Sequence, residues 1–550
     1  MSDHTVLLVV SVLMSGLVAP GPVNQETGGS TPAEIDSCTT ITESGHYALT
    51  ADILNSTEAT CIRIEADDVV LDGAGHTIDG NWSVLRENTG VGDSLFEAFA
   101  NATEIGTANA TVSQWAYHGV FVSESENVTI SGLTVRDWVY GIAFFDVTDG
   151  NIRGVTTEQT ATGVGLFQST TIRTEAVEST NSTIGVVLDD VSVSSVTNSE
   201  INNSVLDGME LFETTGSSIV ENTIRNTGRY DGLYLRNSSQ NTVRDNDIGS
   251  NTLSGIALAR GSNSNIVESN LVEQNGLNGI LVRDNSVLNT VTNNTLEANA
   301  HSGVSVVDGA NQNIVQGNVI RNTTGEDPYT AQVNYSAGIV INQSSRNQVT
   351  ENWVQGNAYS GITLTNEANE NFLTGNTILN TTGVEITVPE TFRTVSVDHP
   401  AAIFIDRSSE NVIRETYVRD SELWSYYSTA VASQNIVRNL TVASIRRYNV
   451  STDPTEAAEF SFVEVATVVS FTGRNVALDA NVTEGIIEPD WEPSRSAPRV
   501  NEVGTSENST LENMSVRWYL RAVPTELVEN TTNRRVRATT TTTTVEGETT

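Results

Sequence analysis

The sequence predicts an all-β solenoid, a parallel β-helix in which each coil takes 22–24 residues. The first observation is a glycine followed by an apolar–x–apolar triplet, which recurs at that spacing through the middle of the chain. The second is a set of asparagines that recur with the same period. A period of this length without helical periodicity indicates one short β-rich coil per repeat, stacked on the coil before it. A leucine-rich repeat has a similar period, but its LxxLxL consensus is absent.

The glycines and asparagines mark equal positions in successive coils. The glycines are Gly119, Gly141, Gly163, Gly185, Gly208, Gly232, Gly255, Gly279, Gly303, Gly338 and Gly361, and Ala402 continues the series. The asparagines of one register are Asn222, Asn246, Asn270, Asn294, Asn318, Asn352 and Asn376. Those of the other register, five residues earlier, are Asn241, Asn265, Asn289, Asn313, Asn347, Asn371 and Asn411.

Stacking explains why both residue types repeat. Coils lie about 4.8 Å apart, so equal positions become neighbours. We expect each asparagine to hydrogen-bond the asparagines above and below it. We expect the apolar pairs to fill the shaft, and each glycine to make a turn that tolerates positive φ.

The start of the shaft carries a resemblance to a known family. The segment CIRIEADDVVLDGAGHTIDG (Cys61–Gly80) reads as strands separated by Asp-Gly turns and fits a cap. With the repeats that follow, it resembles the β-helix proteins of the NosD-like (periplasmic copper-binding) and the carbohydrate-binding and sugar-hydrolysis type. The resemblance covers roughly residues 35–450 and implies a right-handed parallel β-helix. Its motifs are shaft and turn residues, so they specify the fold strongly and the function weakly.

Regions outside the shaft have their own signatures. Residues 1–25 carry an apolar run typical of a signal peptide, without the usual basic residues before it. Residues 455–525 alternate as exposed strands do, which predicts a small β-rich module or a cap on the open end of the shaft. Residues 530–550 form a Thr-rich low-complexity tail. No other segment is long and apolar enough for a membrane helix.

The charge excludes two classes of partner. The chain has 68 Asp and Glu against 28 basic residues, all of them arginine, and a net charge of −40. Nucleic acid and anionic membranes both attract positive charge, so neither is expected as a partner. An acidic surface without lysine resembles the proteins of salt-loving archaea. The alternative is an acidic secreted protein of another source.

The two cysteines and the glycosylation sequons favour export. Cys38 and Cys61 are predicted to form a disulfide, worth about 3 kcal/mol by loop-closure entropy. The competing interpretation, a metal held by the pair, lacks further ligands. Asn-x-Ser/Thr sequons recur, which predicts glycosylation if the protein is exported. We therefore expect an extracellular or cell-surface location.

The outward side chains of the repeat predict a binding face. In each triplet the middle residue and the residue after the triplet are expected to face solvent. The candidates for substrate binding are Phe145, Phe167, Asp189, Glu210, Phe212, Tyr234 and Arg236. Aromatic platforms flanked by carboxylates and arginine suit a polysaccharide, which offers apolar ring faces and many hydroxyls. The alternative is that a loop or the C-terminal module covers these rings.

Catalysis and metal binding are weaker hypotheses. Asp189, Glu210 and Arg236 are the candidates for a hydrolase or a calcium-dependent lyase. The Gly-His-Gly and Arg-x-Lys motifs of pectin hydrolases and the Asp-Pro-His-Asp motif of alginate epimerases are missing, which disfavours an enzyme. Asp207 and Asp231, one coil apart, could share a calcium ion or a proton, or could cap turns before glycine. Copper needs imidazole or soft sulfur ligands, and the few histidines stand far apart.

These observations predict an exported β-helix protein that binds extracellular or envelope polysaccharide. The alternatives are a polysaccharide lyase or hydrolase on the same scaffold, a structural envelope protein, and a NosD-like copper accessory factor. The oligomeric state is left open.

Overall fold

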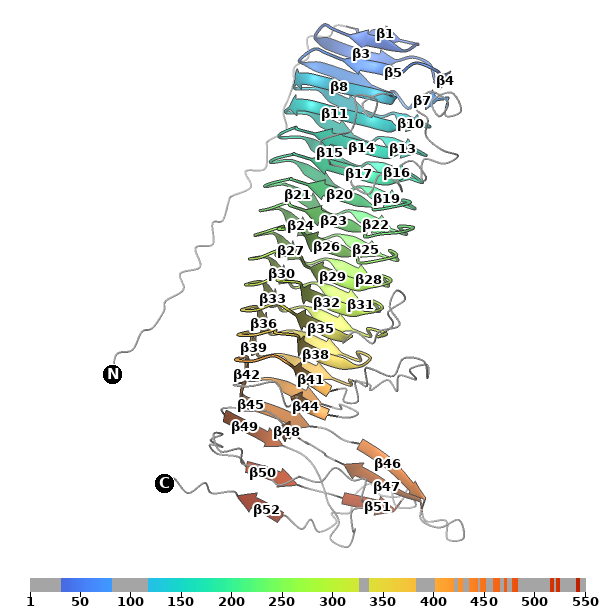
Figure 1. Ribbon diagram of the computed structural model, residues 1–550. Coiled ribbons are helices and arrows are strands. Elements are labelled where there is room, and N and C mark those ends of the chain that lie inside the picture. Colours follow the sequence, from blue (N-terminus) through green and yellow to red (C-terminus); the bar gives the residue numbers. More distant parts are fainter. Residues whose placement is uncertain are drawn as a thin grey trace, which may run out of the picture.

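The computed structural model describes residues 31–81, 117–325, 336–381 and 401–419, together with Asn435 and the backbone of strands between residues 424 and 544. The described residues form an elongated stack of β-coils (Figure 1). No helix among them is long and apolar enough to cross a membrane. The predicted signal peptide, residues 1–25, lies outside the described residues.

Each coil adds one strand to each of three parallel sheets, which we call sheets I, II and III in the order in which they follow one another within a coil, counted from sheet I. The strands of sheet I are β2 (Thr39–Ile41), β5 (Thr60–Ile64), β8 (His118–Glu126), β11 (Tyr140–Thr148), β14 (Thr162–Phe167), β17 (Ile184–Asp189), β20 (Met209–Phe212), β23 (Leu233–Arg236), β26 (Ile256–Ala259), β29 (Asn278–Val282), β32 (Ser302–Val307), β35 (Ala337–Asn342), β38 (Ser360–Thr365), β41 (Ala401–Asp406), β44 (Trp424–Ser428) and β48 (Val469–Phe471).

The other two sheets consist mostly of three-residue strands. Sheet II contains β1 (Ala33–Ile35), β3 (Gly45–Leu49), β6 (Val69–Asp72), β9 (Thr129–Ser131), β12 (Asn151–Arg153), β15 (Arg173–Glu175), β18 (Ser195–Thr197), β21 (Ser218–Val220), β24 (Thr242–Arg244), β27 (Ile266–Glu268), β30 (Thr290–Thr292), β33 (Ile314–Gln316), β36 (Gln348–Thr350), β39 (Phe372–Thr374), β42 (Val412–Arg414), β45 (Ile436–Ala443) and β49 (Ala477–Val482). Sheet III contains β4 (Ile53–Ser56), β7 (Thr77–Gly80), β10 (Thr134–Arg136), β13 (Thr156–Glu158), β16 (Glu178–Thr180), β19 (Glu200–Asn202), β22 (Thr223–Arg225), β25 (Asp247–Gly249), β28 (Leu271–Glu273), β31 (Thr295–Glu297), β34 (Val319–Arg321), β37 (Trp353–Gln355), β40 (Thr377–Leu379) and β43 (Tyr417–Arg419). Sheets II and III meet at β45, which pairs with both β42 and β43.

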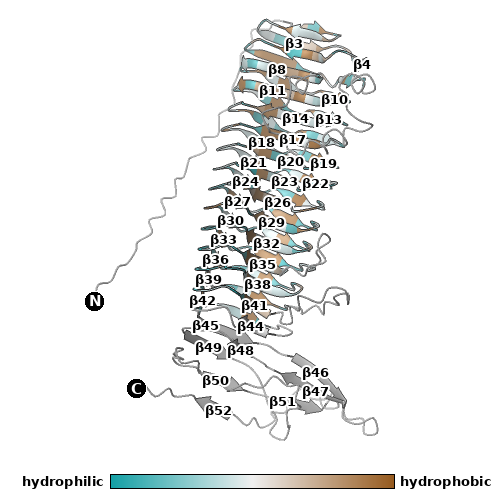
Figure 2. Cartoon of the chain, viewed as in Figure 1, coloured by the Kyte–Doolittle hydropathy of each residue, from teal (hydrophilic) through white to brown (hydrophobic). Residues whose placement is uncertain are grey.

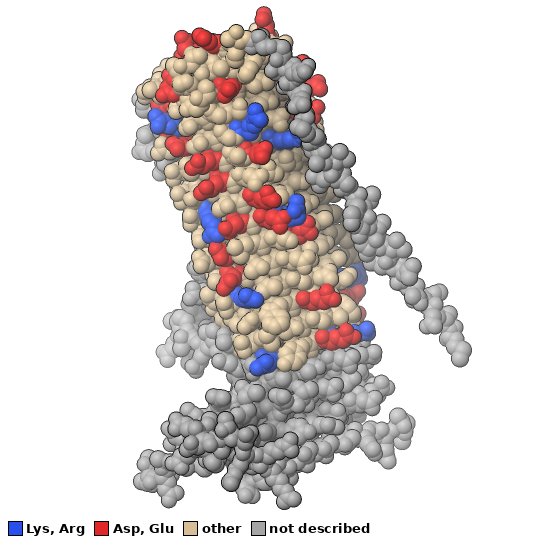
Figure 3. Space-filling view, turned by 180° about the vertical axis from the view of Figure 1, so that it is seen from behind, with Lys and Arg blue, Asp and Glu red and all other residues tan. Residues whose placement is uncertain are grey.

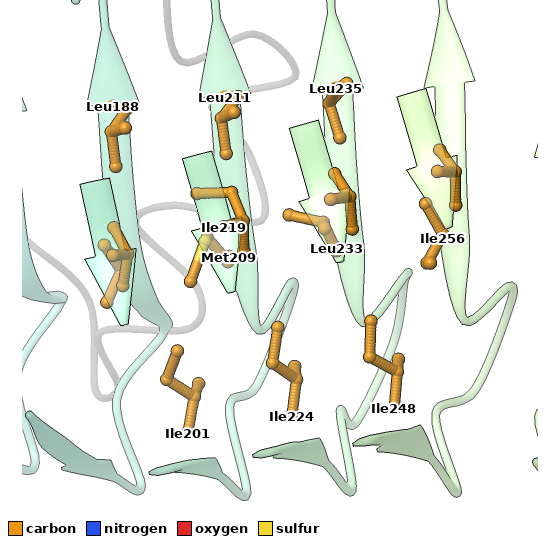
Figure 4. Close-up of a cluster of buried hydrophobic side chains, with 14 of the residues drawn as sticks. Leu188, Ile201, Met209, Leu211, Ile219, Ile224, Leu233, Leu235, Ile248 and Ile256 are labelled. Carbon is orange, nitrogen blue, oxygen red and sulfur yellow. The ribbon is translucent and has the colours of Figure 1, made fainter. Parts of the chain in front are cut away.

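The core is a continuous apolar column inside the three sheets. Sheet I contributes two stacked rows of apolar side chains. Leu188, Leu211 and Leu235, which are fully buried, belong to one of these rows. Sheet II contributes Ile219 and sheet III contributes Ile224, and these side chains meet in the shaft (Figure 4). Apolar segments recur in the strands from coil to coil (Figure 2). In short strands such as β21 and β22 the middle side chain is buried between two half-buried ones, because successive side chains point to opposite faces. The predicted all-β parallel β-helix is therefore confirmed.

Asparagine ladders run along the corners of the coils, as predicted. At the corner between sheets II and III, Asn246 Oδ1 accepts the backbone N–H of Asn222 at 2.9 Å and its side-chain amide at 3.1 Å. The same pattern continues through Asn376. At the corner between sheets I and II a second ladder runs from Asn241 to Asn435. The structure adds a third ladder through Asn251, Asn275 and Asn299, which the sequence analysis did not identify.

The repeating glycines have a different cause from the one expected. None of the glycines that precede the sheet I triplets has positive φ. Instead, a Cβ built on any of these eleven glycines would lie 2.4–2.9 Å from the carbonyl oxygen of the equivalent residue in the next coil. At Gly163 that oxygen belongs to Gly185. The prediction of a positive-φ turn is wrong, and close approach of stacked backbones explains the pattern.

Positive φ occurs instead at corner residues, and one of them is strained. Val193 has φ 51° and is 65% exposed, although a β-branched residue rarely adopts this conformation. The next coil has Gly216 at the equivalent position, with φ 61°. We expect Val193→Asn to raise the free energy of unfolding by about 1 kcal/mol, since asparagine tolerates left-handed backbone. Urea unfolding followed by circular dichroism checks this. Val220→Asn, at a half-buried strand position, should instead lose stability.

The first coils carry a disulfide. Cys38 and Cys61 are joined, as predicted, and span 23 residues of sequence. Cys61 lies in β5 and is buried, so the bridge ties the loop before β2 to the second strand of sheet I.

Backbone strands follow the last described coil. β48 and β49 continue sheets I and II. A separate antiparallel sheet is formed by β46 (Arg446–Ser451), β47 (Glu459–Glu464) and β51 (Arg521–Pro524). β50 (Ser515–Trp518) pairs with β52 (Thr541–Thr544), which lies within the predicted Thr-rich tail.

Candidate functional site

The seven predicted binding residues lie together on the outer face of sheet I. The parallel register places Phe145, Phe167, Asp189, Phe212 and Arg236 in one column over five consecutive coils, β11 to β23. Glu210 and Tyr234 form a neighbouring column two residues earlier along β20 and β23. Because sheet pairing is in register, side chains far apart in sequence become neighbours about 4.8 Å apart along the shaft. We call these seven residues the outer row.

The outer row is less open than the sequence suggests. Phe167 is 5% exposed and Glu210 is 7% exposed, so the prediction that these side chains face solvent is wrong. Asp189, Phe212 and Tyr234 are half-buried. Alternation along a strand shows which side chains point away from the shaft, but not what packs on them.

On the outer face, the coils nearer the N-terminus form an apolar cluster. Phe121, Ala143, Phe167 and Val187 pack together with Ile184 and Leu206, and Tyr140 and Phe145 pack against them. The ring of Tyr140 meets that of Phe167 edge-on, with centroids 5.7 Å apart. The row therefore changes along the shaft from purely aromatic at β11 and β14 to mixed charged and aromatic at β17, β20 and β23.

A buried histidine extends this cluster. His118 begins β8, and its ring stacks on Tyr140 with centroids 5.2 Å apart. Burial, reinforced by the charge of Arg63, lowers the pKa of His118 to about 3. The imidazole is therefore neutral at physiological pH, and it belongs to the aromatic packing and carries no charge for the site.

Asp189 and Glu210 form a carboxyl pair on neighbouring coils. Burial raises the pKa of Glu210 to about 7, Arg236 opposes this rise, and the charge of Asp189 adds to it. Burial also raises the pKa of Asp189 to about 6, and the charges of Glu213 and Asp190 add to that rise. A carboxylic acid with a pKa near 7 can both donate and accept a proton at neutral pH.

Arg236 adds a cation to this carboxyl pair. Its guanidinium carbon lies 4.3 Å above the centre of the Phe212 ring. This cation–π contact holds the guanidinium over the Phe212 ring on the outer face, where its N–H groups can reach a ligand that lies on the row.

Asp207 and Asp231 occupy the position before the repeating glycine in consecutive coils. Asp207 Oδ1 accepts the backbone N–H of Asp231 at 3.0 Å, and Asp231 Oδ1 accepts that of Ser254 at 2.7 Å. These bonds match the turn-capping interpretation and repeat the geometry of the asparagine ladders. Burial raises the pKa of Asp207 well above its usual range, and the charge of Glu210 raises it further.

A metal site is not assembled among the described residues. No three side chains of His, Cys, Asp or Glu in this part of the chain come together in a way that could hold an ion. Asp207 and Asp231, the predicted calcium candidates, instead bind backbone N–H groups, as described above.

Tyr140 is a functional candidate that the sequence analysis left out of the outer row. Burial raises its pKa to about 12, and the charge of Asp189 contributes to the rise, so the phenol lies within electrostatic reach of the carboxyl pair. Its position in the repeat could have identified Tyr140 from the sequence, because it precedes Gly141 as Asp207 precedes Gly208.

Two family descriptions match the chain. "Right handed beta helix region" matches residues 175–320. "Periplasmic copper-binding protein (NosD)" matches residues 254–392 and 330–461. The NosD-matched range holds His301 and His399 but neither Cys nor Met. His301 Nδ1 is already engaged by Ser302 Oγ at 2.9 Å and lies 3.3 Å from Asn278 Oδ1. The described residues of this range therefore do not fit a copper site.

Distant matches among solved structures cover part of the chain. No curated protein sequence matches the chain significantly. A mutant of a periplasmic alginate epimerase is 14% identical, with a TM-score of 0.37, over 60% of this chain and 77% of the other. The A-module of a mannuronan C-5 epimerase from Azotobacter vinelandii is 10% identical, with a TM-score of 0.32, over 66% and 91%.

A third solved structure, DFA-IIIase from Arthrobacter chlorophenolicus A6, is 14% identical, with a TM-score of 0.34, over 68% and 84%. Similarities this low carry no argument about substrate or activity. The matched segments, the three parallel sheets and the coil-to-coil register identify the chain as a right-handed parallel β-helix protein.

Proposed function

We propose that this protein is exported and binds an extracellular or envelope polysaccharide along the outer row of sheet I. The observation that carries the proposal is the in-register column of aromatic, carboxyl and guanidinium side chains over consecutive coils. The column from Phe145 to Arg236 crosses four coil spacings, or about 19 Å. A linear glycan that lies along the shaft would meet an aromatic face and then hydrogen-bonding groups.

Features outside the site support an exported protein. The N-terminal apolar run, the Cys38–Cys61 disulfide and the sequons all suit an oxidising, extracellular environment. The acidic, lysine-free composition favours display at the surface of a salt-loving organism, or release from it.

A second candidate function is cleavage of the bound glycan. Glu210 and Asp189 favour it, because the environment brings the pKa of both carboxyls near neutrality. Their Cα atoms are one coil and two residues apart, or about 8 Å. Glycoside hydrolases use such a pair of carboxyl groups, one as an acid and the other as a base or nucleophile.

A matched pair of aromatic variants tests binding. Phe212→Ala removes a half-buried ring under Arg236, whereas Phe372→Ala removes a half-buried ring with Arg414 at 5.7 Å on sheet II. We expect Phe212→Ala to weaken retention on polysaccharide columns about tenfold, because ring stacking is worth about 1 kcal/mol beyond area burial. Phe372→Ala should bind as the parent does.

The same preparations distinguish the alternatives. Release of reducing or unsaturated ends that stops in Glu210→Gln would identify an enzyme. Equal weakening by both aromatic variants would show that the outer row is not the binding face. Absence of retention on every polysaccharide tested would contradict binding and leave a structural role in the envelope.

A further inference from the structure

Three exposed asparagines at the corners of the shaft lie over glycines of the following coil. Asn285, Asn293 and Asn322 adopt left-handed backbone, with φ between 55° and 59°. A Cβ built on the glycine of the following coil would lie 2.6–2.7 Å from the Oδ1 atom of each asparagine. In the same order, these glycines are Gly309, Gly317 and Gly356. No side chain from the following coil therefore stands against these asparagines.

The preceding coil is equally open beside them. The residues stacked before Asn285, Asn293 and Asn322 are, in that order, Gly261, Ser269 and Ala298. Each of them donates its backbone N–H to the carbonyl oxygen of the residue that precedes the asparagine. A bulky group attached to the side-chain amide of any of the three would thus meet only small residues in the two adjacent coils.

Two of the three asparagines begin an Asn-x-Thr sequon, the acceptor motif for N-linked glycans. Asn293 is followed two residues later by Thr295, and Asn322 by Thr324. Asn285 is followed by Ser286 and Val287 and begins no sequon. The structure therefore offers two acceptor sites and a third asparagine with the same conformation and the same openness but without the motif.

Other sequon asparagines of the shaft have larger neighbours. Asn181 and Asn237 are also exposed and left-handed, but long or charged side chains come before and after them in the stack. The flanking pairs are Gln159 and Asn203 for Asn181, and Glu213 and Arg260 for Asn237. Asn293 and Asn322 are more open than these two, so we call them the open sequons.

Stacking alone does not explain the open sequon at Asn293. The register of Asn293 holds Asp245, Ser269 and Gly317 in neighbouring coils, and the register of Thr295 holds Asp247, Leu271 and Val319. Because both positions accept several residue types, the fold does not require an asparagine and a threonine to occur together there.

The open sequons lie away from the outer row. Asn293 is at the corner between sheets II and III, after β30, and Asn322 follows β34 of sheet III. Their coils come two and three coils after that of β23, where the outer row ends. Charged side chains are scattered over the face of the shaft in Figure 3, with uncharged areas between them. The residues stacked directly on both asparagines are uncharged, so a glycan at either position would displace no ion pair there.

We propose that Asn293 and Asn322 carry N-linked glycans in the exported protein. This inference rests on the export in the proposed function and adds two modification sites to it. The co-substrate is a glycan whose first sugar is esterified through C1 to phosphate, and a separate glycosyltransferase supplies the catalysis. The bond between C1 and the phosphate oxygen breaks, and the phosphate leaves with the electron pair. Nδ2 of the asparagine forms the new bond to C1 and loses one proton.

The side-chain contact of Asn322 is compatible with this step. Its Nδ2 donates one N–H to Glu297 Oε1 at 3.5 Å, which is long for such a bond. Attachment replaces only one of the two hydrogens on Nδ2, so the other can keep the contact.

Mass spectrometry of the full chain, isolated from the cells that produce it naturally, tests the inference. Cleavage after arginine separates the open sequons, because Arg321 lies between them. Fragmentation that keeps the glycan on the peptide then locates it. We expect glycans at Asn293 and Asn322, with higher occupancy than at Asn181 and Asn237, and none at Asn285.

Variants at the sequon threonines test the assignment without touching the asparagines. Thr295→Val should abolish the glycan at Asn293 alone, and Thr324→Val that at Asn322 alone. Thr290→Val is the matched control, because Thr290 begins β30 as Thr295 begins β31, is half-buried as well, and belongs to no sequon. It should keep both glycans.

The outcomes separate this inference from the proposed function. Recovery of the protein outside the cell with both asparagines unmodified would overturn the two sites and keep export. Glycans at Asn181 and Asn237 but not at the open sequons would overturn the sites, as would a glycan at Asn285. Recovery of the unmodified protein only inside the cell would overturn export and the two sites together.

Discussion

Replacing Asn294 by alanine is expected to lower the free energy of unfolding by about 4 kcal/mol or more. Asn294 is fully buried in the ladder between sheets II and III. Its Oδ1 accepts the backbone N–H and the side-chain amide of Asn270, both at 2.9 Å. Its Nδ2 donates to Val267 O at 2.9 Å and to Asn318 Oδ1 at 3.0 Å. Truncation removes these four buried hydrogen bonds, each worth about 1 kcal/mol, and leaves the buried backbone N–H of Asn270 without its acceptor.

The neighbouring residue supplies the control for this prediction. Asn293 is exposed with φ 55°, and the next coil has Gly317 at the same register with φ 64°. Asn293→Gly should change stability by no more than about 0.5 kcal/mol, because glycine adopts this conformation freely. Urea midpoints measured by circular dichroism compare the two variants. A loss below 1 kcal/mol in Asn294→Ala would show that water replaces the ladder bonds and that the ladder is not a main source of stability.

The sequence predicts the shaft well because the shaft repeats a local pattern. Coil length, the inward apolar rows and the two asparagine registers can all be read from spacing alone, and the structure has them where they were expected. The third ladder was missed because Asn251, Asn275 and Asn299 occupy only three consecutive coils, too few to stand out in an Asn-rich chain.

The outer face could not be predicted to the same depth. The alternation of side chains along a strand predicts which residues lie on the outer face, and the seven predicted residues do share that face. The burial of these side chains and the charges around them cannot be predicted from this alternation, because they depend on neighbours contributed by other coils. The pKa of Glu210, for example, is raised by the charge of Asp189 from the preceding coil and lowered by that of Arg236 from the following coil. The glycine pattern is a related case: spacing identified the positions, but only the approach of Gly163 to Gly185 O shows why a side chain is excluded there.

Replacing Glu210 by glutamine is expected to stabilise the protein at pH 8 and to leave it nearly unchanged at pH 4. Glu210 is 7% exposed, and burial, more than the charge of Asp189, raises its pKa from 4.5 to about 7. Below its unfolded pKa such a carboxyl is protonated in both states, so burying it carries no charge penalty. As the pH rises above that value, ionisation favours the unfolded state, and the loss of stability grows until the pH passes the folded pKa. A shift of this size corresponds to about 3 kcal/mol at pH 8. Glutamine removes the buried charge and keeps the shape.

The pH profile of stability distinguishes this cause from improved packing. The difference between Glu210→Gln and the parent should be small near pH 4, grow between pH 4.5 and about 7, and level off above. Glu200→Gln, which removes one negative charge from an exposed position on sheet III, is the matched control for the change in net charge. A gain in Glu210→Gln of equal size at pH 4 and pH 8 would contradict a buried carboxylate. It would also remove the support that Glu210 gives to proton transfer on the outer row, because an acid of ordinary pKa is fully ionised at neutral pH.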